Sequence, residues 1–511
     1  MKIVIIGAGL GGLTAGALLL KAGHDVTVLE AHVYPGGSAG TFFHKGYRFD
    51  AGATLAGGFA PGGPHARLAE ILGLEWPVNP VDPAWVVHLP DGRSITQWAD
   101  ANQWRHERRA AFPTAEPFWR TQEQLADLSW EIASRPFPWP PQSLREVLTV
   151  AGAIRPSTIC ALPYLLRTVG SIAPSDDPMF NAFLDAQLLI AAQTTADYTN
   201  ALYGSAALDL PRRGVNHVSG GIGALAHTLV NRMRQHGGEV LYRQQVTQIE
   251  VKDSRVTAVI TNKGLRQTAD FVLANTTPWA LNTLLGENSP SYLQRKMQQR
   301  KPTWGAFTLY LGVDRAKLPP RLVGHHQVIV DHTQPLGEGN SVFISFADEA
   351  DSERAPEGKT AVTLSTHTAI APWWRLRNGS DQPAYLARRA QYTEKMLTAA
   401  ETAVPGLHSA IDLCLPGTPI TFEFYTRRPG GMVGGFPQNS IFNALGPKTG
   451  IPNLLLVGDS IFPGQSTAGV TLGGMRVAAA VSAATQPVSL PTHHLTSPFL
   501  RLWNINKLIG E

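Results

Sequence analysis

The chain has 511 residues, with 43 basic and 39 acidic side chains and a formal net charge of +4. So small a positive excess argues against a nucleic-acid-binding protein, while the length allows more than one domain and a core that encloses a bulky ligand. Only 16% of the residues are charged, against roughly 25% in ordinary soluble domains, which suits a protein that handles an apolar ligand.

The first feature in chain order is the opening segment MKIVIIGAGLGGLTAGALLLKAGHDVTVLE, whose residues 3–20 carry no charge. Such a run could be a secretory signal, a membrane anchor or the beginning of a nucleotide-binding domain. The third interpretation is favoured, because residues 3–6 predict a buried strand, residues 13–22 predict a helix, and DVTVLE predicts a second strand ending at Glu30. A strand, a glycine turn, a helix and a strand ending in an acidic residue make the βαβ unit that binds dinucleotides.

Three glycines between the first strand and the helix have separate expected roles. They follow the pattern GxGxxG and are Gly7, Gly9 and Gly12. The first permits a tight turn, the second lets the backbone approach a pyrophosphate, and the third allows the helix to pack closely on the strand. The helix N-terminus offers amides and partial positive charge to the phosphates. Glu30 would accept hydrogen bonds from the adenosine ribose and would repel a 2'-phosphate, so NADP is disfavoured.

A second glycine pair follows in the segment AHVYPGGSAGTFFHKGYRFDAGATLAGG. Gly36 and Gly37 predict another close approach of the backbone to phosphate. This segment resembles the flavoprotein superfamily of amine oxidases, phytoene desaturases and carotene isomerases, in which PGG followed by Arg or Ser helps to hold the FAD pyrophosphate. The resemblance implies that Ala31 and Ser38 lie at the cofactor, and that Ala53, within a match to the FDxG segment of the family, lies close to the flavin.

Two later segments supply the remaining parts of the predicted cofactor site. Residues 217–274 predict a glycine turn, an amphipathic helix and several short strands, and by resemblance Val246 occupies the position of a backbone contact to adenine. Further on, the strand LLLV is followed by Gly458 and Asp459 and by a loop that leads into a helix from about Val470. In the family this acidic residue binds the ribityl chain or the pyrophosphate of FAD, and the helix N-terminus borders the isoalloxazine ring.

The fold class that these parts imply is α/β, with a discontinuous Rossmann-type FAD-binding domain and an α+β substrate domain, as in the amine oxidase and phytoene desaturase family. Three separate pieces would form the FAD domain: residues 1–75, 205–290 and 420–485. The rest divides into a substrate domain, residues 76–204 and 291–419, with a proline-broken helical part at 115–200, and a C-terminal extension, residues 486–511.

The helical part contains a candidate membrane-facing segment. Residues 145–172 are apolar, with scattered arginines and no acidic residue after Glu146. They could dip into lipid or cover a substrate tunnel, and both interpretations stay open. No stretch predicts a spanning helix. Cys160 and Cys414 match no metal-binding spacing, so we expect no metal site and two buried, reduced thiols, as in a cytoplasmic protein. From the apolar segment we expect this protein to associate peripherally with a membrane surface.

The resemblance covers nearly the full length and narrows the expected substrate. Segments such as WGAFTLYLGVD and TFEFYTRRPGGMVGGFP look like bacterial carotenoid desaturases, most of all the C-3',4' desaturase group. This implies an FAD-dependent enzyme of carotenoid biosynthesis that removes two hydrogens beside a long polyene. The electron acceptor stays open: oxygen, a quinone or another carrier. Because isomerase-like members share Ser38, a cis/trans isomerase using reduced FAD is the alternative. More distant alternatives are an amine oxidase and a non-catalytic escort protein for prenylated GTPases.

No catalytic residue is assigned from the sequence. The candidates for local help are His217, His325, His326, His367, Tyr425, Arg427 and Arg428. Each is expected to be structural, because most polar side chains in a core are simply satisfied by hydrogen bonds. A desaturase of this kind mainly positions its substrate and excludes water, so a strong acid/base pair is not required.

Overall fold

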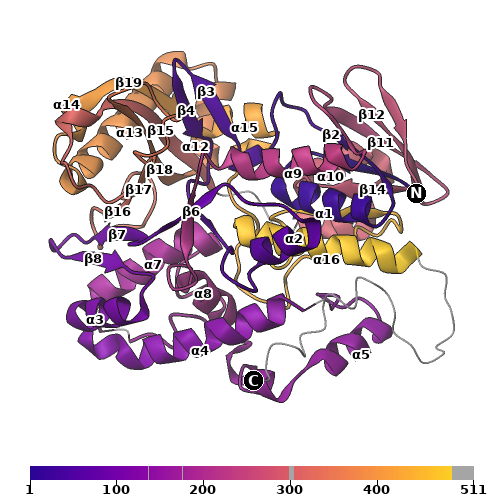
Figure 1. The fold of residues 1–511 in the computed structure, drawn as a ribbon, viewed down its shortest axis with the longest axis horizontal. Helices are drawn as coiled ribbons and strands as arrows, with labels where there is room; N and C mark the ends of the chain where they lie inside the picture. Colours follow the sequence, from indigo (N-terminus) through magenta and orange to yellow (C-terminus); the bar gives the residue numbers. More distant parts are fainter. Residues whose placement is uncertain (136, 175, 299–303, 486–511) are drawn as a thin grey trace.

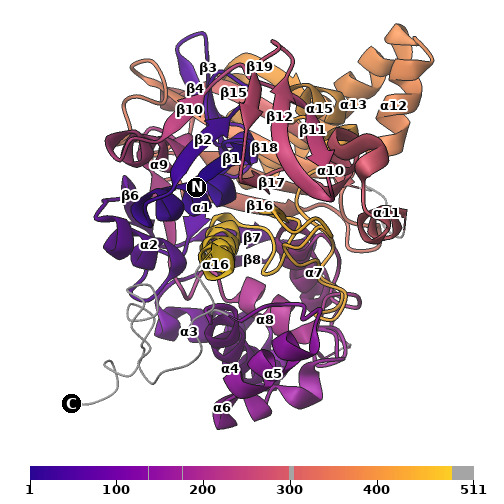
Figure 2. The ribbon, with the colours of Figure 1, turned by 90° about the vertical axis from the view of Figure 1, so that its right-hand side faces the viewer.

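The computed structural model describes residues 1–135, 137–174, 176–298 and 304–485. Three regions meet around the middle of the molecule (Figure 1): a parallel sheet with its helices on the right, a large sheet at the upper left, and a helical layer below. The turned view keeps the helical layer at the bottom (Figure 2). The predicted C-terminal extension, residues 486–511, lies outside the described residues.

The parallel sheet has five strands in the order β10-β2-β1-β14-β20, all parallel. Its strands are β1 (Lys2–Ile6), β2 (Asp25–Leu29), β10 (Glu239–Leu241), β14 (Phe271–Ala274) and β20 (Leu454–Leu456). Residues 3–6 of β1 are all buried, because helices cover both faces of the sheet. Three stretches far apart in sequence therefore build one sheet, and the predicted α/β class with a Rossmann-type sheet is confirmed.

Helices α1 (Leu10–Lys21) and α16 (Thr467–Thr485) pack against each other at the sheet, with α9 (Gly223–Gln235) beside α1. Glycines set their separation: a Cβ on Gly474 would lie 2.5 Å from the Gly11 carbonyl oxygen. Both helices begin three residues earlier than predicted, α1 at Leu10 and α16 at Thr467. Their first turns therefore reach closer to the glycine loops than the sequence indicated.

A seven-stranded sheet forms the centre of the predicted substrate domain, in the order β19-β15-β18-β17-β16-β7-β8. Its strands are β7 (Trp85–His88), β8 (Ser94–Gln97), β15 (Trp304–Asp314), β16 (His325–Ile329), β17 (Ser341–Phe346), β18 (Lys359–Ala369) and β19 (Ile411–Gly417). Helices α12 (Ile370–Asn378) and α13 (Gln382–Ala403) pack on one face through a buried cluster that includes Phe307, Trp373 and Tyr392. Strands β7 and β8 join from an earlier part of the chain, and the division into domains stays a prediction.

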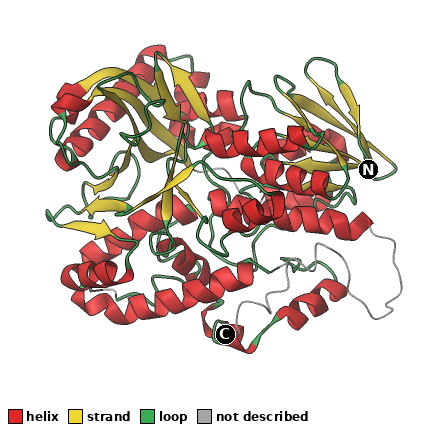
Figure 3. Cartoon of the chain, viewed as in Figure 1, coloured by secondary structure: helices red, strands yellow, loops and turns green. Residues whose placement is uncertain are grey.

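The helical layer (Figure 3) contains the part predicted to be helices broken by proline, residues 115–200, and extends beyond it at both ends, because α3 and α8 lie outside that range. Its helices are α3 (Ala101–Ala111), α4 (Glu116–Ala133), α5 (Leu144–Ala153), α6 (Pro156–Ile159), α7 (Pro178–Ala192) and α8 (Ala201–Leu208). Aromatic side chains from α4 and α7, among them Trp119, Phe180 and Phe183, form its core. Helix α5 differs from the others because none of its residues is buried.

The remaining elements connect these regions. They are α2 (Pro64–Leu72), α10 (Pro278–Leu285), α11 (Ser291–Gln298), α14 (Leu407–Ala410), α15 (Pro419–Thr426), β3 (Thr41–His44), β4 (Tyr47–Asp50), β5 (Ala56–Gly57), β6 (Val78–Val81), β9 (Val215–Val218), β11 (Val246–Lys252), β12 (Arg255–Thr261) and β13 (Arg266–Thr268). Among the described helices, none combines the length and the hydropathy that a membrane-spanning segment requires.

The positions of the two cysteines contradict part of the prediction that both thiols are buried. Cys414 is half-buried, but Cys160 is exposed, so its predicted burial is wrong. Cys160 follows the short helix α6 on the outer side of the helical layer, where an apolar sequence does not lead to a buried position. No three His, Cys, Asp or Glu side chains of the described ranges are grouped so that they could hold a metal ion.

The packing of α1 on α16 predicts that alanine substitution at two neighbouring glycines changes the free energy of unfolding in different ways. Gly474→Ala should lower the free energy of unfolding by about 1–3 kcal/mol, because its Cβ would meet the Gly11 carbonyl oxygen at 2.5 Å. Gly473→Ala is the matched control, since its Cβ would approach no atom closer than 3.9 Å and alanine favours the helix. Thermal unfolding of both variants measures the difference, and equal melting temperatures would contradict the packing argument.

Candidate cofactor and substrate site

One cavity of about 1740 Å³ lies between the parallel sheet, the seven-stranded sheet and the helical layer. It is larger than the roughly 300–1,000 Å³ of an ordinary ligand pocket, so it has room for a dinucleotide and a second long ligand. All the predicted cofactor residues except Gly12 line this cavity. The structure thus brings together residues from three distant parts of the chain.

The turn after β1 is built around Asn275, which follows β14. Gly7 has φ 93°, and its N–H donates to the Leu29 carbonyl at 2.8 Å. The Asn275 side-chain amide donates to the Gly7 carbonyl at 3.3 Å, and a Cβ on Gly9 would lie 2.6 Å from the same amide nitrogen. Gly12 lies behind the cavity, where its Cβ would meet the Asn275 Cβ at 2.9 Å. The absence of side chains at these glycines therefore leaves space for the Asn275 side chain as well as for a ligand.

Asn275 was missed in the sequence analysis. The available signal was its position directly after a strand of the parallel sheet, because ligands of such sheets bind at the carboxyl ends of the strands.

Glu30 is held in place by two backbone amides. Its Oε2 accepts from the Ala8 N–H at 2.7 Å and its Oε1 accepts from the His32 N–H at 2.7 Å. Burial raises the pKa of Glu30, and these amide hydrogen bonds only partly oppose that effect. A carboxylate can accept about four hydrogen bonds, so Glu30 keeps capacity to accept from ribose hydroxyls.

The PGGS segment brings a second stretch of backbone to the cavity. Gly36 has φ 115° and donates its N–H to the Ala8 carbonyl at 2.8 Å, which ties this segment to the first glycine turn. At Gly37 a Cβ would meet no atom within 4 Å, so this backbone faces open space. The Ser38 carbonyl accepts from the Ala53 N–H at 3.4 Å, while Ala31 lies at the other end of the segment.

The C-terminal half of the site consists of the turn after β20 and the beginning of α16. Gly458 has φ 114°, and Asp459 follows it at the cavity wall. Val470 lies in the first turn of α16, where Ser466 Oγ accepts the Gly469 N–H at 3.0 Å. The N-termini of α1 and α16 thus bring partial positive charge to one cavity. Val246, the first residue of β11, lines the same cavity.

These features fit an FAD molecule. Backbone facing open space at Gly37, two helix N-termini and a fixed carboxylate are the groups that a diphosphate and a ribose require. The individual contacts to the cofactor stay predictions, because the structure establishes only that these groups share one cavity.

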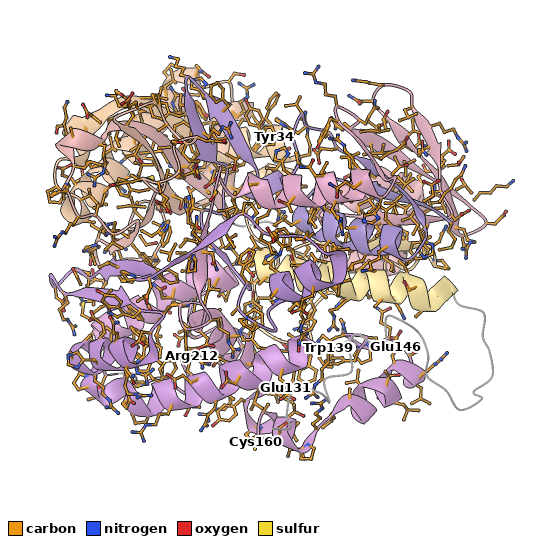
Figure 4. The ribbon with its side chains drawn as sticks, in the orientation of Figure 1. Tyr34, Glu131, Trp139, Glu146, Cys160 and Arg212 are labelled. Atoms are coloured by element: carbon orange, nitrogen blue, oxygen red, sulfur yellow. The ribbon has the colours of Figure 1, made fainter. Side chains whose placement is uncertain are left out.

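The rest of the cavity is mostly apolar and extends to the surface. Tyr34 and Trp139 both line it, and Figure 4 shows them in different parts of the molecule, Tyr34 above the parallel sheet and Trp139 beside the helical layer. Trp139 Nε1 donates to the Ile441 carbonyl at 3.0 Å, which keeps the indole in the wall. Where the cavity approaches α5, the lining residues are exposed: Ile154 (53%), Leu162 (53%) and Phe442 (52%). The cavity therefore has an apolar opening on the side of the helical layer.

Only one of the four candidate histidines reaches the cavity. His367 lines it, and burial lowers its pKa to about 4, so the ring is neutral at neutral pH. His325 and His326 hydrogen-bond with Ser345 Oγ and with the His88 ring, both at 3.0 Å, and neither lines the cavity. His217 contacts Asp351 and lies outside the cavity too. Of the other candidates, Tyr425, Arg427 and Arg428 do line it.

Comparisons with known proteins show the family to which the chain belongs. Residues 10–482 match the family described as flavin containing amine oxidoreductase. The chain is 30% identical to the chloroplastic prolycopene isomerase of Daucus carota, over 94% of this chain and 80% of that protein. It is 26% identical to a neurosporene-forming phytoene desaturase of Rhodobacter capsulatus, over 95% of each. The crystal structure of an oxidoreductase from Methanosarcina mazei superposes with a TM-score of 0.63 at 20% identity, covering 93% of this chain and 99% of that one, which shows the fold alone.

The fixed carboxylate predicts how the cofactor affinity depends on pH. Glu30→Gln should weaken FAD binding roughly tenfold, because an amide cannot accept from both the Ala8 and the His32 N–H groups and from ribose as well. In the wild type, affinity should be full at neutral pH and fall on acidification at a pH above the usual carboxyl range, since the pKa of Glu30 is raised. The variant should lack that loss.

Quenching of flavin fluorescence during titration of the FAD-free protein measures both effects. The matched control is Glu239→Gln, an exposed glutamate on the neighbouring strand β10, which should bind FAD like the wild type. Wild-type affinity in Glu30→Gln would contradict the assignment.

Proposed function

This chain belongs to the flavin-containing amine oxidoreductase family and is an FAD-dependent oxidoreductase, and from that premise we propose that it modifies carotenoids. Relatives that it matches over nearly its full length carry the names of a carotenoid isomerase and a carotenoid desaturase. The observation that supports this most is the large cavity described above, with the predicted cofactor residues on one side and apolar walls leading to an apolar opening on the other. A long polyene needs such a space.

We further propose that the reaction is desaturation, with the introduction of a C-3',4' double bond. The bound FAD supplies the acceptor for two electrons. The protein itself has to orient a flexible chain and keep water away, which apolar residues such as Leu55, Phe343 and Phe462 do at the cavity wall. A neutral His367 is available in that wall to hold a proton, but a conjugated chain that spreads charge does not require a strong base.

A second candidate, cis/trans isomerisation, is favoured by a specific observation. The relative from Daucus carota, 30% identical over 94% of this chain, is a prolycopene isomerase. Isomerisation leaves the substrate mass unchanged, so the two candidates differ in a measurable quantity.

Incubation of the FAD-loaded protein with defined acyclic carotenoids in liposomes distinguishes these reactions. We expect a product lighter by two hydrogens, detected by chromatography and mass spectrometry, when oxygen or a quinone is present. A product of unchanged mass with altered retention and absorption, formed only when FAD is reduced, would assign the isomerase instead. No change of any carotenoid under either condition would contradict both, and the FAD-free protein is the control.

We also propose that the enzyme takes its substrate from a membrane surface through the opening beside α5. Exposed apolar side chains gather there and are called the apolar patch: Leu144, Val147, Leu148, Ile154, Ile159, Leu162 and Leu166. The patch is continuous with the cavity, because Ile154 and Leu162 belong to both. Exposed Arg145 and Arg167 are placed to meet lipid headgroups. An apolar substrate could then pass from lipid to cavity without crossing water.

The apolar patch predicts weaker liposome binding when it is made charged. Leu148→Glu combined with Leu166→Glu, at side chains that are 64% and 85% exposed, should reduce binding to anionic liposomes about tenfold or more. Leu386→Glu is the matched control, an exposed leucine of α13 on another side of the molecule. Cosedimentation measures binding, and equal binding of all three proteins would contradict this docking surface.

A further inference from the structure

Arg428 connects the substrate side of the cavity to the cofactor side. It follows α15, at the beginning of a loop over residues 427–436. Further along this loop, Met432 forms a bridge to Gly305 of β15, and the Val433 N–H donates to the Trp304 carbonyl at 3.1 Å. The loop is therefore attached to the seven-stranded sheet, while its other side faces the turn after β20.

All of the bonds that Arg428 makes converge on this junction. Its Nε donates to the Met432 carbonyl at 3.0 Å, and its Nη2 donates to the Gly434 carbonyl. Its Nη1 donates to Asp459 Oδ2 at 2.9 Å, and the two side chains are only 13% and 21% exposed. The backbones meet as well, because a Cβ on Gly435 would lie 2.1 Å from the Asp459 carbonyl oxygen. The loop and the Asp459 turn thus form one unit.

The position of Asp459 raises an electrostatic question. It lines the same cavity as Glu30 and the two phosphate-binding glycine segments, so a bound FAD would place a diphosphate with two negative charges in the same space. An unpaired carboxylate there would repel the cofactor, and partial burial strengthens that repulsion. The neighbouring Arg427 lines the cavity too, but its guanidinium lies over the Phe424 ring at 5.2 Å, whereas Arg428 pairs directly with Asp459.

We propose that Arg428 is a positioning residue for the cofactor: it orients Asp459 and offsets its charge, so that a hydrogen-bond acceptor can be placed beside an anionic dinucleotide. The same guanidinium holds the loop that joins the cofactor site to the wall of the substrate cavity. The proposal rests on FAD binding and not on the carotenoid reaction, so either can fail without the other.

A double-mutant cycle on FAD affinity tests this role. Arg428→Met should weaken FAD binding on the order of tenfold or more, because it leaves the Asp459 carboxylate uncompensated. Asp459→Asn should weaken binding less, since the amide still offers one acceptor. The double variant Arg428→Met/Asp459→Asn should bind FAD more tightly than Arg428→Met and within about threefold of Asp459→Asn.

This cycle separates charge compensation from simple support of the loop. Both variants that contain Arg428→Met lose the bonds to Met432 and Gly434, so a purely structural role predicts that the double variant binds as weakly as Arg428→Met or more weakly. That result would overturn the proposal, and so would wild-type affinity in Arg428→Met. The control is Arg266→Met, which breaks the exposed pair of Arg266 with Glu250 at 2.6 Å and should leave FAD affinity unchanged.

Circular dichroism of the FAD-free protein reports whether Arg428→Met folds. If it does not fold, two further measurements still test the proposal. Arg428→Lys keeps the charge and should bind FAD within a few-fold of the wild type, whereas a loss as large as tenfold would overturn the proposal. The comparison of Asp459→Asn with the double variant remains available, and a much weaker double variant would also overturn it.

Discussion

The site depends on the close approach of backbones at the carboxyl ends of a parallel sheet. Helices α1 and α16 begin side by side there, and small residues such as Gly11 and Gly474 allow their contact. A diphosphate can be recognised by backbone amides and helix dipoles only where no side chain intervenes. The glycines at this edge are therefore a condition for both the packing of the helices and the shape of the cavity.

The charge distribution around this edge is less simple than a positive pocket for an anion. Glu30 accepts from the Ala8 and His32 amides, and Asp459 is paired with Arg428, so these two carboxylates have fixed donors. Acidic side chains held in this way can accept hydrogen bonds from hydroxyl groups, and helix N-termini carry the partial positive charge that attracts phosphate.

The substrate side has the opposite character. Its wall is apolar, its one candidate histidine is neutral because burial lowers the pKa of His367 to about 4, and its opening is surrounded by exposed leucines and isoleucines. Such a wall orients an apolar chain by shape and excludes water, and contributes little acid or base chemistry. Desaturation and isomerisation of a polyene place similar demands on it, so the wall alone does not choose between them.

The sequence by itself determined the cofactor class and the parts of the site that are local in the chain. The pattern GxGxxG, the acid at Glu30, the PGG pair and the GD turn after a strand each express a constraint of the backbone within a few residues, and all of these segments except Gly12 line one cavity. Tertiary structure alone decided the contacts between segments distant in the chain: Asn275 with Gly7, Arg428 with Asp459, and the exclusion of His325 and His326 from the cavity. It also decided that Cys160 is exposed and that no residue of α5 is buried. The physical reason is that a turn or a strand depends on nearby residues, whereas burial and long-range pairing depend on where the folded chain brings its distant parts together.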